Sequence, residues 1–121
     1  MSKVQNPKQY DLEERSFRFA KRCADFIRKL PKTITNIEYG KQLARSSGSQ
    51  AANYIEANES LSKKDFSLRV KISRKEAKES RLWLRLIHPG ENSEMINEQN
   101  ELIQEAEELT KIYGSIVEKS K

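Results

Sequence analysis

The chain has 121 residues, 34% of them charged and 36% hydrophobic, which suits one modest core and a largely polar surface. No stretch approaches the roughly 20 consecutive apolar residues that span a bilayer, and the first residues lack the apolar run of a signal peptide. One cysteine and one histidine exclude an internal disulfide and a zinc site built within one chain. We therefore expect one cytoplasmic domain over residues 1–121, with residues 1–10 as an N-terminal arm, and no membrane partner.

Charge is distributed unevenly along the chain. Residues 1–50 hold 11 Lys/Arg and 5 Asp/Glu, residues 51–90 hold 9 and 5, and residues 91–121 hold 3 and 8. A basic body thus precedes an acidic C-terminal segment, although the net charge is only +5. A basic surface of this kind attracts polyanions.

Capping signals and prolines predict four helices and no strand. Asp11 with Glu14 has the spacing of a capping box, which predicts a first helix over about 12–29 that ends before Pro31. Thr35 with Glu38 repeats that spacing and predicts a second helix over about 36–59.

Two further helices follow. Ser62 is the predicted N-cap of a third helix that continues to about residue 87, where we expect His88 to cap the C-terminus ahead of a proline and a glycine. A fourth helix is predicted over about 93–118. Because every connection is short, consecutive helices should run antiparallel.

Apolar and small residues recur at alternating intervals of three and four in three of these helices. The positions are Leu12, Ser16, Phe19, Cys23, Phe26 and Leu30; Phe66, Val70, Ser73, Ala77, Ser80, Leu84 and Ile87; and Met95, Gln99, Leu102, Ala106, Leu109, Tyr113 and Ile116. Heptad spacing keeps one side of a helix against its partners, so we predict an all-α, up-down-up-down four-helix bundle. In it, Cys23 is an ordinary buried thiol.

The second helix is unusual because residues 44–53 are small and polar. Gly48 in a helix interior costs about 1 kcal/mol relative to alanine. The lysine and glycine pattern of a phosphate-binding loop is missing, so close helix packing is the favoured explanation.

The third helix carries a second apolar stripe, centred on Leu68, Ile72, Trp83 and Leu86. Part of this stripe widens the core. The remainder, together with Tyr39 and Tyr54, is a candidate subunit interface, because large exposed apolar patches are unusual on monomers.

Two rows of cations are candidate nucleic-acid contacts: Arg15, Arg18, Arg22 and Lys29 on the first helix, interrupted by Asp25, and Lys71, Arg74, Lys78, Arg81 and Arg85 on the third. Either row can follow phosphates in a salt-dependent way, or it is an ordinary solvated face. A third alternative is that Glu101, Glu105 and Glu108 of the last helix lie beside the third-helix row and neutralise it. Interleaved aromatics are missing, so any binding should not depend on base sequence.

Glu76 should be partly buried and therefore needs a partner. Arg45 is the expected one, in a structural polar network that includes Asn53 and Glu56. The competing interpretation treats Glu56, Glu76 and Glu79 as acid/base or metal-binding carboxylates. Bundles that bind two metals use paired Glu-x-x-His motifs, which the chain lacks. We therefore predict no catalytic, metal or cofactor site.

Several short motifs occur in order across residues 10–87. They are Tyr10-Asp11-Leu12-Glu13-Glu14-Arg15, Phe19-Ala20, Leu30-Pro31, Gln42-Leu43-Ala44-Arg45-Ser46, Ala52-Asn53-Tyr54-Ile55-Glu56-Ala57, Ser62-Lys63-Lys64-Asp65-Phe66, Lys75-Glu76-Ala77 and Trp83-Leu84. In this order they resemble the four-helix bundle proteins encoded by intervening sequences of bacterial 23S rRNA genes. The last helix is similar only in pattern.

The resemblance implies a left-handed antiparallel bundle that assembles as a ring-shaped homopentamer and has no established enzyme activity. The chain also resembles, more distantly, the accessory protein of diversity-generating retroelements, whose basic pentamer engages nucleic acid and a reverse transcriptase. We predict a non-enzymatic oligomer that binds structured RNA through the third-helix row. The alternative is a protein-interaction scaffold without a nucleic-acid role.

Overall fold

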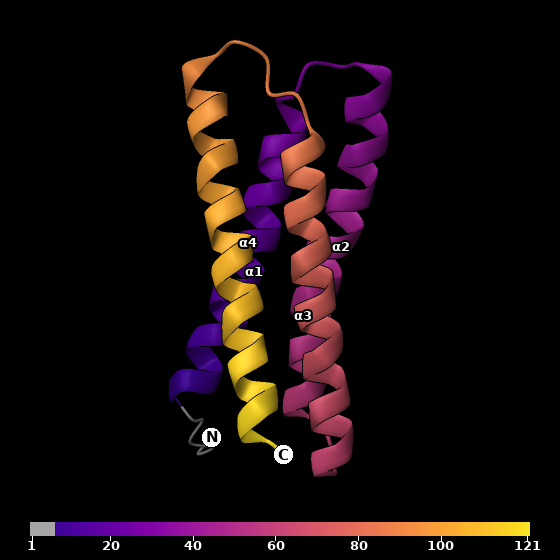
Figure 1. Ribbon diagram of the computed structural model, residues 1–121, viewed down its shortest axis with the longest axis vertical. Coiled ribbons are helices and arrows are strands. Elements are labelled where there is room, and N and C mark those ends of the chain that lie inside the picture. The colour runs from indigo at the N-terminus through magenta and orange to yellow at the C-terminus, as the bar shows by residue number, and fades with distance from the viewer. Residues whose placement is uncertain (1–6) are drawn as a thin grey trace, which may run out of the picture.

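The computed structural model describes residues 7–121, with side chains from residue 11 onward, as four helices and no strand (Figure 1). They are α1 (Pro7–Arg28), α2 (Ile34–Asn58), α3 (Lys63–Leu86) and α4 (Ser93–Lys119). Consecutive helices run in opposite directions, and the start of α1 and the end of α4 lie at the same end of the molecule (Figure 1). The predicted all-α, up-down-up-down four-helix bundle is confirmed.

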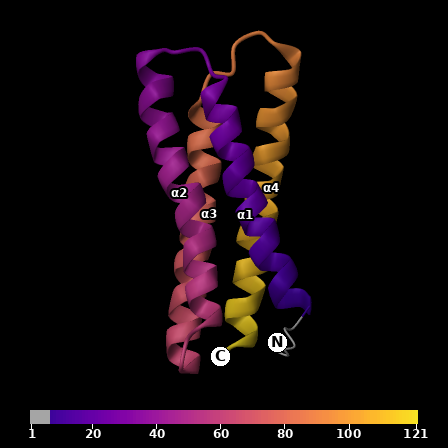
Figure 2. The same cartoon turned by 180° about the vertical axis from the view of Figure 1, so that it is seen from behind.

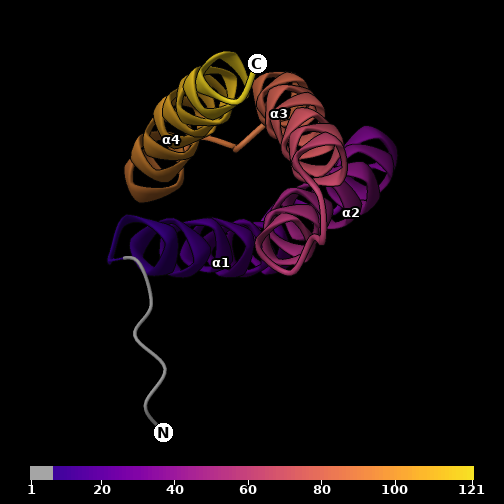
Figure 3. The same cartoon turned by 90° about the horizontal axis from the view of Figure 1, so that it is seen from below.

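The helices form a ring in chain order, with α4 returning to α1 (Figure 3). The contact between α2 and α3 is the most extensive and that between α1 and α4 the least. Figure 2 shows the cause, because α1 crosses the bundle obliquely while the other helices run nearly upright. Near the chain ends this tilt accompanies a cavity of about 650 Å³.

The core consists mainly of residues that the heptad spacing selects, together with Leu43, Tyr54 and Ala57 of α2. Because Tyr54 is only 4% exposed, its suggested place in a subunit interface was wrong. Leu12, Phe19 and Cys23 of α1 are buried, as are Val70 and Ala77 of α3 and most of the predicted positions on α4. Phe66 and Ile116, near the cavity, are only partly buried. Val117 is buried beside Ile116, because a straight helix drifts relative to a strict heptad.

Two helix starts differ from the prediction. α1 begins at Pro7, so Asp11 lies inside the helix, and both its capping box and the arm over residues 7–10 were wrong. Proline suits the first helical position because the missing N–H has no partner there anyway. The N-cap of α2 is Thr33 instead of Thr35, and its Oγ1 accepts from the Asn36 N–H at 3.1 Å.

The two loops at the opposite end are joined by a buried amide. Asn36 donates to the Pro31 and His88 carbonyls at 3.0 and 2.8 Å, and its Oδ1 accepts from the His88 N–H. The prediction that His88 caps α3 was wrong. Gln99 of α4 caps that end, because its Nε2 donates to the Leu84 and Ile87 carbonyls at 2.8 Å each. Ser62 caps the start of α3 as predicted.

Small residues bring α2 close to α3, as expected for residues 44–53. The Ser46 and Ser80 hydroxyls share a hydrogen bond of 2.7 Å, and both side chains are fully buried. Gly48 takes no part in this packing, since an added Cβ would meet nothing within 4 Å. Gly40 does allow a close approach, but between α2 and α1, because its added Cβ would lie 3.2 Å from Ile27 of α1.

A buried hydrogen-bond network centres on Gln50 and involves all four helices. Its Nε2 donates to the Ser16 carbonyl of α1 at 2.8 Å, and its Oε1 accepts from the Tyr113 hydroxyl of α4 at 2.6 Å. Ser73 of α3 donates to the Gln50 carbonyl at 2.9 Å. The heptad position of Gln50, seven residues after Leu43, was the available signal for this network.

Candidate nucleic-acid interface

Two of the predicted α1 cations, Arg15 and Arg22, face α4 and are paired with its carboxylates. Arg15 contacts Glu105 and Glu108 at 2.7 Å each, and Arg22 contacts Glu98 and Glu101 at 3.0 Å. These are charge-assisted, partly forked hydrogen bonds that hold the weakest contact of the bundle together. Arg15 and Arg22 are therefore structural cross-links.

The remaining α1 cation differs from those two. Arg18 pairs only within its helix, with Glu14 at 3.3 Å, and its side chain is 69% exposed. An exposed pair of this kind contributes little to stability. Of the predicted first-helix contacts, Arg18 and Lys29 are the exposed ones, and Lys29 lies just past the end of α1.

Titration behaviour follows from the same contacts. Hydrogen bonding to Glu105 raises the pKa of Arg15, and bonding to Glu98 raises that of Arg22. Hydrogen bonds from Gln104 and then Arg15 lower the pKa of Glu108. Each of these three shifts favours the charged form, so Arg15, Arg22 and Glu108 are charged at neutral pH.

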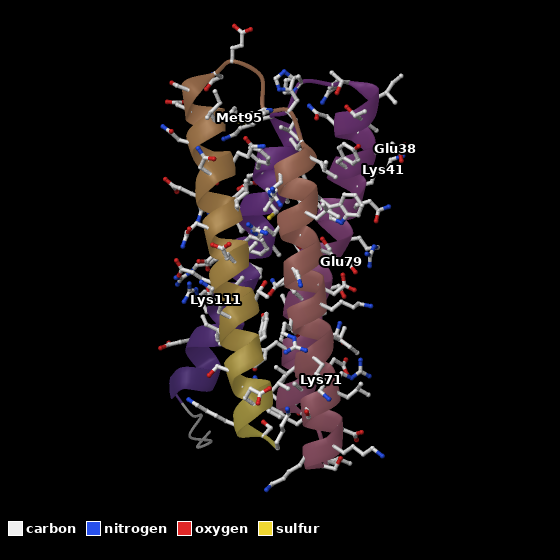
Figure 4. The ribbon with its side chains drawn as sticks, in the orientation of Figure 1. Glu38, Lys41, Lys71, Glu79, Met95 and Lys111 are labelled. Atoms are coloured by element: carbon white, nitrogen blue, oxygen red, sulfur yellow. The ribbon has the colours of Figure 1, made fainter. Side chains whose placement is uncertain are left out.

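Three of the predicted α3 cations point away from the bundle and have no carboxylate partner among the described residues. We call Lys71, Lys78 and Arg85 the basic row; they are exposed and follow one another at intervals of seven residues. Within the described part of the chain, none of the three lies within ion-pair distance of an acidic side chain. Figure 4 labels Lys71 on α3 and Lys111 on the adjacent α4.

Arg74 and Arg81, the other two predicted cations, turn toward α4. Arg81 pairs with Glu107 at 3.3 Å, and the Arg74 side chain lies beside Gly114, whose added Cβ would be 3.6 Å from its Cδ. The suggestion that Glu101, Glu105 and Glu108 neutralise this row was wrong. Those three residues are on the side of α4 nearest α1, and only Glu107 reaches α3.

Further cations extend the basic row at the end of the bundle. Two surface hollows of about 360 and 440 Å³ lie where α3 begins and α4 ends, and their linings include Lys63, Lys64, Lys71, Lys119 and Lys121. Sequence reasoning missed this cluster because Lys63, Lys64 and Lys71 lie 48 to 58 residues before Lys119 and Lys121 in the chain. The antiparallel topology was the available signal, since it brings these two helix ends together.

The predicted polar network is only partly present. Arg45 lies 3.7 Å from Glu76 and 3.5 Å from Glu79, and the Glu76 side chain is only 8% exposed. Asn53 instead bonds to Arg69 at 3.0 Å and to Ser49, while Glu56 is exposed and not brought to the Arg45 pair. The structure thus unites Arg45 with Glu76 and leaves the other two predicted members apart.

Other chemistry finds little support in the described residues. They contain no group of three metal-binding side chains, and Cys23 is buried with its thiol pKa raised by desolvation. None of the described helices combines the length and apolar character needed to cross a membrane.

Comparisons with known proteins agree with this architecture. The family model for the 23S rRNA-intervening sequence protein matches residues 8–115. The chain belongs to this family. The resemblance read from the motifs of α1 to α3 is thereby confirmed and extends into α4.

A solved structure adds support for the fold. The chain is similar to a protein of unknown function from the S23 ribosomal protein family of Bacteroides thetaiotaomicron, with 26% identity and a TM-score of 0.75. The similarity covers 92% of this chain and 98% of the other. A comparison with curated protein sequences finds no match. Family membership therefore establishes architecture and leaves the activity to be argued from the surface.

Proposed function

We propose that the protein binds structured RNA, independently of base sequence, through the basic row of α3. The observation that carries the proposal is the contrast between the two predicted rows of cations. Arg15 and Arg22 form ion pairs with α4 carboxylates. Lys71, Lys78 and Arg85, in contrast, are exposed and form no ion pair among the described residues. Such cations are available to displace counterions from a phosphate backbone.

The spacing of the basic row suits contact with the phosphate backbone of RNA. Seven residues of α-helix rise about 10.5 Å, so the three cations span about 21 Å along one side of α3. Phe17, on α1, is the one aromatic among the exposed large hydrophobic side chains of the described residues. With no aromatic platform beside the row, base stacking is absent and binding should follow phosphate positions and helix shape.

The proposed role is binding without catalysis, in the cytoplasm, where structured RNA is found. Two of the carboxylates that a hydrolytic site could have used, those of Glu76 and Glu79, form ion pairs with Arg45. The homopentamer implied by the family resemblance stays a prediction.

Neutralising the basic row tests the proposal. In the triple variant Lys71→Gln/Lys78→Gln/Arg85→Gln, affinity for a structured ribosomal RNA fragment should fall at least about tenfold at physiological salt. Fluorescence anisotropy across a salt series should also show a log–log slope smaller by about three, one unit for each lost phosphate contact. Circular dichroism should be unchanged, because all three side chains are exposed.

A matched control removes the same charge elsewhere. Lys21, Lys32 and Lys41 are exposed on α1, after it and on α2, and their replacement by glutamine leaves the same net charge as the test variant. The control should retain most of the affinity. If both variants lose affinity equally, binding reflects net charge alone. If the test variant binds like the parent, the basic row is not the site, and a nuclease-resistant pull-down should then be used to look for protein partners.

A further inference from the structure

The junction of α3 and α4 repeats one contact after seven residues, with a glycine in place of a glutamate. Arg81 of α3 pairs with Glu107 of α4, whose Oε2 lies 3.3 Å from its Nη2. Seven residues back along α3 is Arg74, and seven residues on along the antiparallel α4 is Gly114. These two residues also meet, because a Cβ added to Gly114 would lie 3.6 Å from the Arg74 Cδ and 3.9 Å from its Nη1. The bundle thus pairs Arg81 with a carboxylate and holds Arg74 against a position that has no side chain.

Three lysines surround Arg74 at this junction. Lys71 and Lys78, three residues before it and four after it, are its neighbours on the surface of α3. Lys111 is three residues before Gly114 and is the corresponding neighbour on α4. All three lysines are exposed, and Figure 4 labels Lys71 and Lys111 on the two adjacent helices. We call Arg74 and these three lysines the junction cations.

The junction cations have no internal counter-charge in the part of the chain that the structure describes. None of them lies within ion-pair distance of an acidic side chain. The α4 carboxylates closest to Lys111 and Gly114 in the sequence are paired with other residues, in the pairs Glu107–Arg81, Glu108–Arg15 and Glu118–Lys121. Cations three and four residues apart repel one another, so this cluster favours a bound anion.

We propose that the junction cations bind one phosphate group of the RNA backbone over Gly114, with Arg74 as its principal contact. The inference rests on the proposed function and extends its site from α3 onto α4. A guanidinium can donate two parallel hydrogen bonds to two oxygens of one phosphate, while lysines act as point charges around it. A polyanion suits the junction better than a single acidic side chain, because the basic row continues from Lys78 to Arg85, about 10.5 Å further along α3.

Gly114→Glu tests the proposal without removing a cation. The new carboxylate would repeat the Arg81–Glu107 pair one heptad along the junction and occupy the Arg74 donors. Helicity and the urea midpoint should therefore not fall. Affinity for the structured ribosomal RNA fragment should fall at least about tenfold at physiological salt, the loss expected when a charge-assisted hydrogen bond is no longer available.

Two control variants separate the Arg74 contact from net charge and from the glycine itself. Asn97→Glu adds the same charge at an exposed position near the start of α4. Gly114→Ala adds only a Cβ, at an ordinary contact distance from Arg74. Both should retain most of the parent affinity in fluorescence anisotropy. If Gly114→Glu binds RNA no more weakly than Asn97→Glu, the phosphate contact at Arg74 is wrong, whereas loss of binding in the triple variant of the basic row would leave the proposed function standing.

Nuclear magnetic resonance distinguishes failure of this site from failure of the proposed function. The Arg74 Nε–H resonance, assigned by its disappearance in Arg74→Lys, should shift when inorganic pyrophosphate is added to the parent. In Gly114→Glu it should shift much less. If the parent binds no RNA at physiological salt and the resonance still shifts, the phosphate site stands and its RNA ligand is wrong. A resonance that neither pyrophosphate nor RNA moves overturns the proposal.

Discussion

Gln50 shows how one residue can fix the relative positions of four helices. Its amide bonds to α1 and α4, and its backbone carbonyl receives the Ser73 hydroxyl of α3. Each of these groups is buried, so losing a partner carries the full cost of desolvation. The Tyr113 hydroxyl depends on this amide, and burial raises the pKa of that phenol.

Gln50→Ala should therefore lower the free energy of unfolding by about 3 kcal/mol, because it leaves a cavity and an unsatisfied Tyr113 hydroxyl. Urea denaturation followed by circular dichroism measures the loss. Gln42→Ala, on the exposed side of the same helix, is the control and should change stability by less than about 0.5 kcal/mol. A similar small effect at Gln50 would show that the network does not stabilise the bundle.

Gly48 is a second residue whose contribution is local. It lies inside α2 with open space where a side chain would begin. Gly48→Ala should raise the free energy of unfolding by about 1 kcal/mol, since alanine restricts the unfolded chain and favours the helix. Gly40→Ala is the comparison, because its Cβ would press on Ile27 at 3.2 Å and cancel part of the same gain. Equal gains at both sites would contradict this account of the packing.

At the scale of the elements, α1 is held differently from the other helices. α2, α3 and α4 pack extensively along their lengths, whereas α1 meets α4 over a limited area. Ion pairs from Arg15 and Arg22 supplement that area. The attachment of α1 to α4 should therefore depend on pH more than the rest of the bundle does.

The direction of this pH dependence follows from the pKa shifts of Glu108 and Arg15. The pKa of Glu108 is lowered in the folded state, so its contribution is present above the ordinary glutamate pKa of about 4.3 and is lost as pH falls through the folded value. The pKa of Arg15 is raised, and its contribution would be lost only above the pH range in which proteins are handled. Acid is thus the side on which the contact weakens.

Denaturant midpoints at about pH 6 and about pH 3.5 should show a loss of stability in acid for the parent. The double variant Arg15→Gln/Arg22→Gln should be less stable at the higher pH and lose less on acidification, because its carboxylates no longer have cationic partners. An unchanged pH dependence in the double variant would place the acid sensitivity elsewhere in the chain.

At the scale of the whole molecule, the acidic residues of α4 are directed mainly toward α1. The outward part of α3 thereby keeps its positive charge.

Much of this architecture was readable from local patterns. The heptads of α1, α3 and α4 selected the buried residues because the 3.6-residue period of a helix fixes which side chains share a face. Ser62 was a reliable cap for the same reason, as its hydroxyl acts within one helical turn.

The pairing between helices was decided only by the tertiary structure. A sequence gives the angle of Arg15 or Arg81 around its own helix, but the neighbour it meets depends on how the helices rotate and tilt against one another. That rotation turned Glu105 and Glu108 toward α1, and only Glu107 toward α3. It also brought Gln99 to the end of α3, where His88 was expected. Local periodicity therefore determined which residues are buried, and long-range packing determined which charges remain free to bind.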